Sequence, residues 1–267
     1  LGKPRDFARY YYEQGADELM FMDVVASLYE RNSLAEIISE TAKKMFIPLT
    51  VGGGIRTIED IRNVLRAGAD KVCVNTAAIK NPQFIEKAAL KFGSSTIVVA
   101  IEAIKEADGR YLAYTDNGRE YPGVEVVACA KKVEDLGAGE IVITSVDREG
   151  TGQGFDSELT SKISTAVSIP VIAHGGAKDP DDVTSVVTKG KADAVAIASI
   201  FHYDYIRRNG IDANTFEKEG NISFLNSGRS FNKIKPFPIR EVKQKFEEAS
   251  IPTRRFLYRS DEESSNC

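Results

Sequence analysis

The sequence predicts an α/β fold, a (β/α)8 TIM barrel built from two repeated half-barrels, and three observations predict it. Short runs of β-branched residues alternate with amphipathic helical stretches, which is typical of a parallel sheet. Several of the strands are apolar along their whole length, as strands covered on both faces are. Landmarks in the first half of the chain recur 122 residues later in the second half.

The alternation places seven strands and the helices between them. The predicted strands are residues 19–22, 48–51, 71–75, 96–101, 140–144, 170–173 and 194–198. The clearest amphipathic helices are residues 58–67, 82–92, 125–136 and 179–189. Glycines stand where helices end, a position that favours a residue with positive φ. They are Gly15, Gly68, Gly137 and Gly190.

The internal repeat is the most specific of the three observations. Four pairs are each 122 residues apart: Gly15 and Gly137, Pro48 and Pro170, Gly53 and Gly175, and Gly68 and Gly190. Residues 48–77 align without a gap on residues 170–199, so we interpret the chain as two copies of one four-strand unit. The counterpart of strand 96–101 would precede residue 1. We therefore expect the first strand of the barrel to be missing from this chain.

A single barrel domain accounts for all 267 residues. Within it we expect residues 203–236 to be an insertion before the last helix and residues 261–267 to be a disordered tail. The net charge of −4, from 35 Lys+Arg and 39 Asp+Glu, argues against a nucleic-acid partner held by an overall basic field. No apolar run approaches the ~20 residues that span a bilayer, so no membrane partner is expected either.

The cysteines, the histidines and the glycine motifs of the sequence indicate which cofactors and which compartment to expect. The three cysteines are few, odd in number and far apart, which fits a cytoplasmic protein without a disulfide or zinc framework. Only two histidines are present, too few for a His-rich metal site. A GxGxxG motif that opens a helix is absent, so no dinucleotide cofactor is indicated. We expect no cofactor and no metal.

Two glycine-rich loops at equivalent places in the repeat predict phosphate sites. Gly52-Gly53-Gly54 and Gly175-Gly176 each follow a strand, and a second strand of each half ends in Asn75-Thr76-Ala77 or Ala198-Ser199. Glycines let the backbone approach an anion, and helix N-termini offer free N–H groups. In a barrel these loops share the C-terminal face, which favours a ligand with a phosphate at each end. Simple turn chemistry is the alternative interpretation.

Carboxylates that follow strands are candidates for acid–base chemistry: Asp23, Glu102, Asp147 and Glu149. Burial near a barrel mouth tunes the pKa of such groups. Glu102 is the strongest candidate because it directly ends an apolar strand. Ordinary helix caps and solvated loop acids are the competing interpretation. His174 sits inside the second Gly-Gly loop, where ligand contact and backbone positioning are equally open, and no nucleophilic triad can be assembled.

Several segments are found together in one known family. They are residues 17–23 (DELMFMD), 50–55 (TVGGGI), 68–72 (GADKV), 75–78 (NTAA), 137–140 (GAGE) and 144–151 (TSVDREGT). They resemble the cyclase subunit family of imidazole glycerol phosphate synthase, from histidine biosynthesis. The resemblance covers residue 4 to about residue 202 and returns near residues 238–254.

The resemblance implies a two-half-barrel lyase that forms a heterodimer with a glutaminase (glutamine amidotransferase) subunit. Ammonia from that partner passes through the barrel and reacts with a bisphosphorylated ribulosyl aminoimidazole carboxamide ribonucleotide. The products are imidazole glycerol phosphate and an aminoimidazole carboxamide ribonucleotide.

The resemblance also implies roles for individual residues. Glu102 would be catalytic, and Glu18, Lys71 and Glu140 would form the ammonia gate, whose arginine partner falls in the missing segment. Substrate and phosphate contacts would come from Asp23, Gly54, Asn75, Thr76, Asp147, Glu149, Gly150, His174, Gly176, Ala198 and Ser199. One phosphate would lie at Gly54, Asn75 and Thr76, and the other at Gly150, Gly176, Ala198 and Ser199.

The sequence departs from the family pattern at its catalytic positions. The family uses two aspartates; the first falls in the missing segment, and Glu102 replaces the second. Glu149 stands where an Asp is usual, and His174 where a Ser is common. The loops 147–149 and 173–176 are more similar to paralogues that work with amidotransferases to aminate surface sugars. That paralogue, and a non-catalytic barrel that activates the glutaminase, are the alternative functions.

Overall fold

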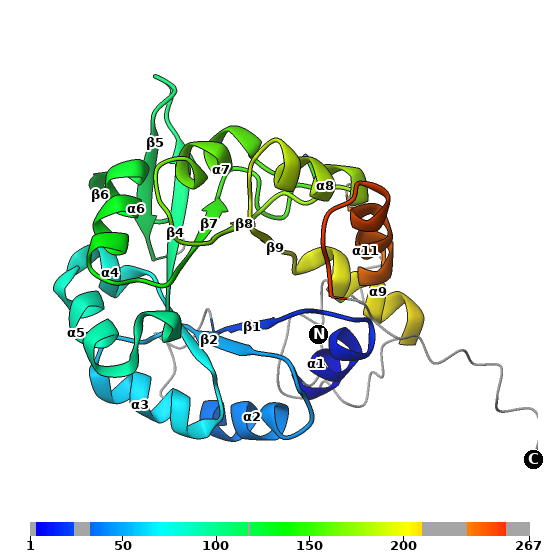
Figure 1. The fold of residues 1–267 in the computed structure, drawn as a ribbon, viewed down its shortest axis with the longest axis horizontal. Coiled ribbons are helices and arrows are strands. Elements are labelled where there is room, and N and C mark those ends of the chain that lie inside the picture. Colours follow the sequence, from blue (N-terminus) through cyan, green and yellow to red (C-terminus); the bar gives the residue numbers. More distant parts are fainter. Residues whose placement is uncertain (1–3, 24–32, 117, 210–233, 255–267) are drawn as a thin grey trace, which may run out of the picture.

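A parallel barrel sheet surrounded by helices makes up the computed structural model, which describes residues 4–23, 33–116, 118–209 and 234–254 (Figure 1). Its parallel strands, in their order across the sheet, are β1 (Leu19–Met22), β2 (Leu49–Gly52), β3 (Lys71–Val74), β4 (Ile97–Lys105), β7 (Glu140–Ser145), β8 (Val171–His174) and β9 (Ala194–Ala196). This is also their chain order, as in a barrel where each strand pairs with the next. The predicted fold class is confirmed.

Helices form the outer ring around the sheet (Figure 1). They are α1 (Pro4–Glu13), α2 (Ser33–Ala42), α3 (Ile58–Ala67), α4 (Thr76–Lys80), α5 (Gln83–Phe92), α6 (Val126–Asp135), α7 (Ser157–Ser164), α8 (Pro180–Thr188), α9 (Ser199–Asn209) and α11 (Ile239–Glu248). Each of the four helices predicted from the sequence lies within one residue of its predicted bounds. Within the described part of the chain, no helix has the length and apolar character needed to cross a membrane.

Helices close the barrel at the place where the described part of the sheet is open. Among the described residues no pairing joins β1 to β9, the two ends of the sheet. At this gap α1 lies against α9 and α11 (Figure 1). Phe7, Tyr11 and Ile239 are buried together there. Packing between helices therefore holds the two open edges of the sheet together.

Side chains of the strands alternate between two cores, as the period of two requires. One set, which includes Val72 and Val99, packs against the helices. The other set fills the barrel interior: Met20, Cys73, Val98, Ala100, Val142 and Ile172. The alternation also decides which residues at the strand ends face the barrel mouth. Glu102, two residues after Ala100, is one of them.

The repeat of the two halves is visible in single hydrogen bonds. At the start of α3 the Asp60 amide donates to Thr57 Oγ1 at 3.1 Å, and at the start of α8 the Asp182 amide donates to Asp179 Oδ1 at 2.8 Å. Both pairs are helix N-caps, and corresponding members are 122 residues apart. The duplication therefore extends to the helix caps.

The gapless alignment of the two halves is wrong by one residue. Thr50 pairs with Lys71 across β2 and β3, whereas Ile172 pairs with Ala194 across β8 and β9. The offset thus grows from 122 to 123 residues between these strands. The extra residue lies after α8, where Lys191 (φ 57°) takes the left-handed conformation that Gly68 (φ 119°) takes after α3. Lys191, not Gly190, is the structural equivalent of Gly68.

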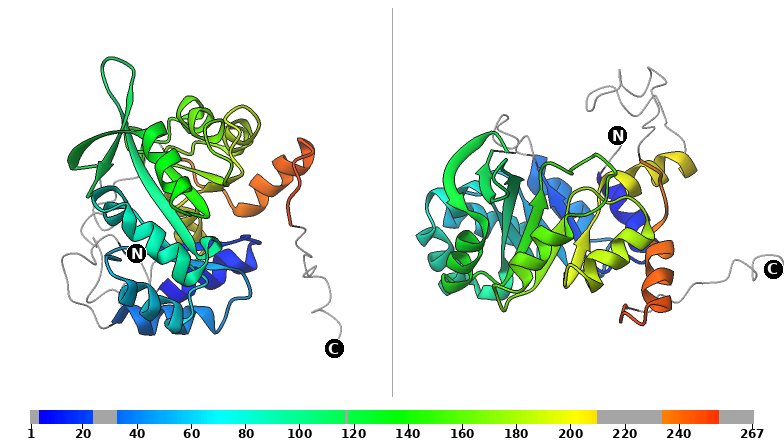
Figure 2. Two further views of the ribbon diagram at one scale, coloured as in Figure 1. Left: turned by 60° about the vertical axis from the view of Figure 1, so that its left-hand side comes forward. Right: turned by 90° about the horizontal axis from the view of Figure 1, so that it is seen from above.

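An antiparallel hairpin that the sequence analysis did not predict follows the fourth parallel strand. β4 continues to Lys105, four residues beyond its predicted end, and pairs with β5 (Tyr111–Thr115), which pairs in turn with β6 (Glu120–Glu125). The hairpin stands out from the body of the barrel (Figure 2). An Asp108-Gly109 turn between alternating residues was the available signal.

The predicted insertion and tail lie largely outside the described residues. Of residues 203–236, the first seven continue α9 to Asn209, and residues 234–236 lead toward α11. Residues 210–233 and 261–267 are not among the described residues, so both assignments stay predictions.

Candidate active site at the barrel mouth

Three polar side chains face the interior at the carboxyl ends of neighbouring strands. The strand registers place Glu102 beside Thr144 and Thr144 beside His174, so the three form a row across β4, β7 and β8. The Glu102 Oε2 atom accepts a hydrogen bond of 2.8 Å from the amide of Gly118, in the turn between β5 and β6. The predicted catalytic carboxylate therefore lies in the mouth and is oriented by a backbone donor.

His174 is a neutral neighbour in this row. Its Nδ1 lies 3.1 Å from Thr144 Oγ1. Burial lowers the pKa of His174, and the nearby charge of Glu149 only partly offsets this, so the net shift is downward. An uncharged imidazole donates or accepts hydrogen bonds without adding a charge to the mouth.

The first glycine-rich loop packs tightly against the chain that follows β1. Gly53 has a φ of 104°, and a Cβ there would lie 2.2 Å from the backbone oxygen of Asp23. At the end of the next strand, the side-chain nitrogen Nδ2 of Asn75 donates to the Ala100 carbonyl at 3.0 Å. The Thr76 hydroxyl donates to Asn75 Oδ1 at 3.1 Å. Because β2 and β3 are neighbours, Gly54 (φ 68°) lies at the same edge as these side chains.

The second loop repeats this arrangement at the ends of β8 and β9. Gly175 has a φ of 93°, and a Cβ there would lie 2.7 Å from the Ser145 backbone oxygen. The amide of Gly154 donates to the Gly176 carbonyl at 2.7 Å, which ties the loop to the segment that contains Gly150. The strands β2 and β8 lie on opposite sides of the barrel (Figure 1). The paired loops therefore face each other across the mouth.

The remaining predicted residues occupy the rim. Ala198 and Ser199 connect β9 to the first turn of α9. Asp23 follows β1, and its amide donates to the Gly52 carbonyl at 2.9 Å. Glu149 is exposed, whereas Asp147 Oδ2 accepts from the Lys105 amide at 2.8 Å and thereby supports the base of the hairpin.

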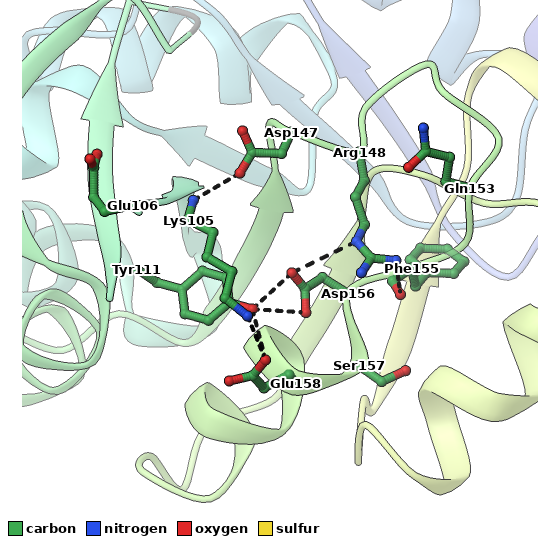
Figure 3. A pocket seen from close by; sticks show the side chains of 10 residues that line it. All are labelled: Lys105, Glu106, Tyr111, Asp147, Arg148, Gln153, Phe155, Asp156, Ser157 and Glu158. Carbon is green, nitrogen blue, oxygen red and sulfur yellow. Dashed lines mark hydrogen bonds and ion pairs between the residues drawn. The ribbon is translucent and has the colours of Figure 1, made fainter. Parts of the chain in front are cut away.

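A pocket of about 580 Å³ lies beside the mouth, between the hairpin and the chain that leads from β7 into α7 (Figure 3). Its lining is Lys105, Glu106, Tyr111, Asp147, Arg148, Gln153, Phe155, Asp156, Ser157 and Glu158. Of the predicted site residues only Asp147 belongs to it. The sequence did not predict this pocket, because the hairpin that forms one of its walls was not predicted either.

A charged cluster occupies the opposite end of the barrel. Lys71 Nζ donates to Glu140 Oε1 at 2.7 Å and to Glu18 Oε2 at 2.9 Å. Burial pushes the pKa of Lys71 down, but the hydrogen bonds to Glu140 and Glu18 outweigh it, and the net shift is upward. The three residues named together by sequence are thus in contact, at the amino ends of β1, β3 and β7.

The polar mouth, the apolar interior and the charged base together define a class of protein. It is a duplicated (β/α) barrel whose mouth and base are separated by an apolar interior. Comparisons with known proteins agree with this class. The model of the family described as histidine biosynthesis protein matches residues 1–207.

Three curated relatives are similar to the chain, and all are named imidazole glycerol phosphate synthase subunit HisF. The protein from Alkaliphilus metalliredigens is 50% identical over 205 residues, which are 77% of this chain and 81% of the relative. That from Legionella pneumophila is 56% identical over 176 residues, 66% and 83% respectively. That from Dehalococcoides mccartyi is 50% identical over 202 residues, 76% and 79% respectively. The chain belongs to the family of these cyclase subunits, which are lyases of histidine biosynthesis.

Proposed function

We propose that the barrel mouth binds a bisphosphorylated ribulosyl aminoimidazole carboxamide ribonucleotide and uses ammonia to convert it to imidazole glycerol phosphate and aminoimidazole carboxamide ribonucleotide. The observation that carries this proposal is the pair of equivalent glycine loops on opposite sides of the mouth, with Glu102 between them. A ligand with a phosphate at each end spans such a mouth, and its middle lies over the carboxylate.

Each phosphate has a set of donors on one side of the mouth. The first set is Gly54, Asn75 and Thr76, which follow the neighbouring strands β2 and β3 at the mouth. The second set is Gly150, Gly176, Ala198 and Ser199, at the N-terminus of the 11-residue helix α9. Free amides at a helix start favour negative charge. Asp23, Asp147, Glu149 and His174 would contact the substrate from the rim.

Glu102 is suited to proton transfer in this mouth. Its carboxylate is held by the Gly118 amide, and its neighbour His174 is neutral. A positioned acid or base of this kind contributes about 10²–10⁴ in rate. The glutamate carries one methylene more than the family's aspartate, so its reach depends on the Gly118 contact.

Ammonia would enter from the base, where we propose that a glutaminase subunit docks in a heterodimer. The names of the relatives as synthase subunits support a partner. Glu18, Lys71 and Glu140 would control entry, and the apolar interior beyond them, which includes Cys73, offers little to hold a polar molecule. Cys73 and Cys129 are buried free thiols, which supports a reducing cytoplasm as the compartment.

Turnover of the bisphosphate substrate, with an ammonium salt or with glutaminase and glutamine, tests the proposal. Glu102→Gln should reduce kcat by about 10²-fold or more while calorimetry still detects substrate binding. Glu106→Gln is the matched control, because Glu106 lies on the hairpin and contacts Tyr114 instead of the mouth. Absence of turnover with both nitrogen sources contradicts the proposed reaction. Unchanged kcat in Glu102→Gln contradicts the assigned role of Glu102.

A further inference from the structure

We propose that His202 positions the second phosphate site by holding the carbonyl of Ala198 at the start of α9, and that Tyr11 orients the His202 ring. The inference rests on the proposed phosphate site at Ala198 and Ser199 and adds two residues to it. Neither His202 nor Tyr11 lies in a glycine loop or at the end of a strand. Their role follows from contacts between α1 and α9.

The Ala198 carbonyl is a shared acceptor. The backbone amide of His202 donates to it at 2.9 Å, which is the first hydrogen bond of α9. The ring Nδ1 of His202 lies 2.9 Å from the same oxygen. A carbonyl only accepts, so this contact places the ring proton on Nδ1. The hydroxyl oxygen of Tyr11 lies 2.9 Å from Nδ1 as well, and with the proton on Nδ1 it is a second acceptor of the same N–H.

Helix α1 fixes the imidazole in place. The Phe7 ring stacks on the His202 ring, with centroids 4.9 Å apart and planes tilted by 28°. Phe7 and Tyr11 are both buried. Burial lowers the pKa of His202 and raises that of Tyr11, so both groups are neutral near pH 7. In the described part of the chain β9 is at one end of the sheet, so no strand pairs with its outer edge there. Contacts with α1 restrain the start of α9 instead.

Holding the carbonyl also orients the adjacent amide. The Ala198 C=O and the Ser199 N–H belong to one planar peptide unit and point in opposite directions. With the carbonyl turned toward the helix, the Ser199 N–H is turned out of the helix start, where a phosphate would lie. His202 and Tyr11 are therefore positioning residues and need no contact with the substrate.

A pair of His202 variants separates the hydrogen bond from the ring packing. Both His202→Asn and His202→Gln lose the stacking on Phe7, but only the asparagine keeps a donor near the place of Nδ1. His202→Gln should raise the Kd of inorganic phosphate and the KM of the bisphosphate substrate about five- to tenfold, with kcat unchanged. His202→Asn should stay within about twofold of the wild type. Equal losses in both variants would overturn the inference.

A second pair tests the contribution of α1. Tyr11→Phe removes the second acceptor of the Nδ1 proton, so the ring loses one of the contacts that orient it, and both constants should rise severalfold. Tyr10→Phe on the same helix removes only the 2.8 Å bond to Asp204 and should leave them unchanged. Binding in Tyr11→Phe equal to that of the wild type would overturn the role of Tyr11, even if the His202 variants fail to fold.

One further variant separates this inference from the proposed site itself. Ser199→Glu places a carboxylate at the start of α9 and should weaken phosphate binding. If Ser199→Glu has no effect, the phosphate site is wrong. If Ser199→Glu weakens binding but His202→Gln and Tyr11→Phe do not, the site stands and only the positioning role is wrong.

Discussion

Glu18 and Glu140 stand 122 residues apart and hold the same ammonium group, that of Lys71, at 2.9 and 2.7 Å. They lie at the amino ends of equivalent strands of the two halves, β1 and β7, so the duplication supplied both carboxylates. Lys71 has no such counterpart, because Ala194 occupies the matching position in β9. Two carboxylates thus share one cation, and the half-barrel symmetry is broken at the base.

Removal of the shared cation should destabilise the barrel. Lys71→Met keeps most of the apolar stem but leaves two half-buried carboxylates facing each other. The Lys71 side chain is 18% exposed, so we expect a loss of about 1–2 kcal/mol in the free energy of unfolding, measured by urea denaturation. Lys80→Met is the control: that side chain is 51% exposed beside Asp116 and Glu120, so its loss should have a much smaller effect on the free energy of unfolding.

The pH dependence of this difference follows from the raised pKa of Lys71. A raised folded-state pKa contributes stability below the unfolded pKa of about 10.4, and that stability is lost as pH rises through the folded value. The difference between the wild type and Lys71→Met should therefore stay constant from about pH 6 to 9. A difference that shrinks within this range would mean that Lys71 is not held by the two carboxylates.

Gly53 and Gly175 should be equally intolerant of a side chain. In each case a Cβ would overlap a backbone oxygen, that of Asp23 or Ser145, and φ is positive. We expect either alanine variant to lose about 3 kcal/mol or more, or not to fold. Gly93→Ala is the control, because its φ is also positive but no atom lies within 4 Å, so about 1–2 kcal/mol is expected. Thermal melts of the three variants measure the contrast.

The periodicity of apolar residues and the residue types of each segment predicted most strands and helices of the barrel. The strand Leu19–Met22 and the helix Ile58–Ala67 have the predicted bounds, because a short apolar run and an amphipathic pattern are local signals. The sequence predicts that strand β4 ends at residue 101, where the apolar run stops before Glu102. It continues because β5 pairs with it beyond the barrel, a partner that the sequence analysis had not placed.

The features that were not predicted depend on backbone conformation and on contacts between residues far apart in the sequence. Gly68 was matched to Gly190 by residue type, but the structural equivalent is Lys191, since backbone φ decides the match and the sequence does not display it. The contact of Tyr11 with His202 joins residues 191 positions apart on helices that flank the open sheet edges. No periodic pattern specifies a side-chain contact at that separation.

Tyr111 should anchor the hairpin to α7. Its hydroxyl donates to Asp156 Oδ2 at 3.0 Å (Figure 3). The ammonium groups of Lys105 and Lys162 lie 5.1 and 5.0 Å from its ring centroid. Tyr111→Phe leaves the buried Asp156 carboxylate with one donor fewer and should cost about 1–2 kcal/mol. Tyr114→Phe removes the hydroxyl contact with Glu106 and should leave the free energy of unfolding nearly unchanged. Amide exchange in β5 should accelerate only in Tyr111→Phe.

His174 should make the protein less stable as pH falls below neutrality. Its folded-state pKa lies below the ordinary value of 6.5, because burial disfavours the imidazolium. The unfolded chain then binds more protons, and the free energy of unfolding falls with pH by at most about 1.4 kcal/mol per unit for this group. His174→Asn keeps an amide near Thr144 and removes the titration, so its loss of stability between about pH 7 and 5.5 should be smaller than that of the wild type.

The two histidines of the chain allow a direct check of this explanation. Because only His174 and His202 are present, the resonance that disappears in His174→Asn assigns both ring signals in an NMR titration. Burial lowers the pKa of His202 too, so both signals should titrate below about pH 6.5. A His174 signal that titrates at or above that pH would mean that the imidazole is solvated and charged, and the acid-dependent loss of stability would then need another cause.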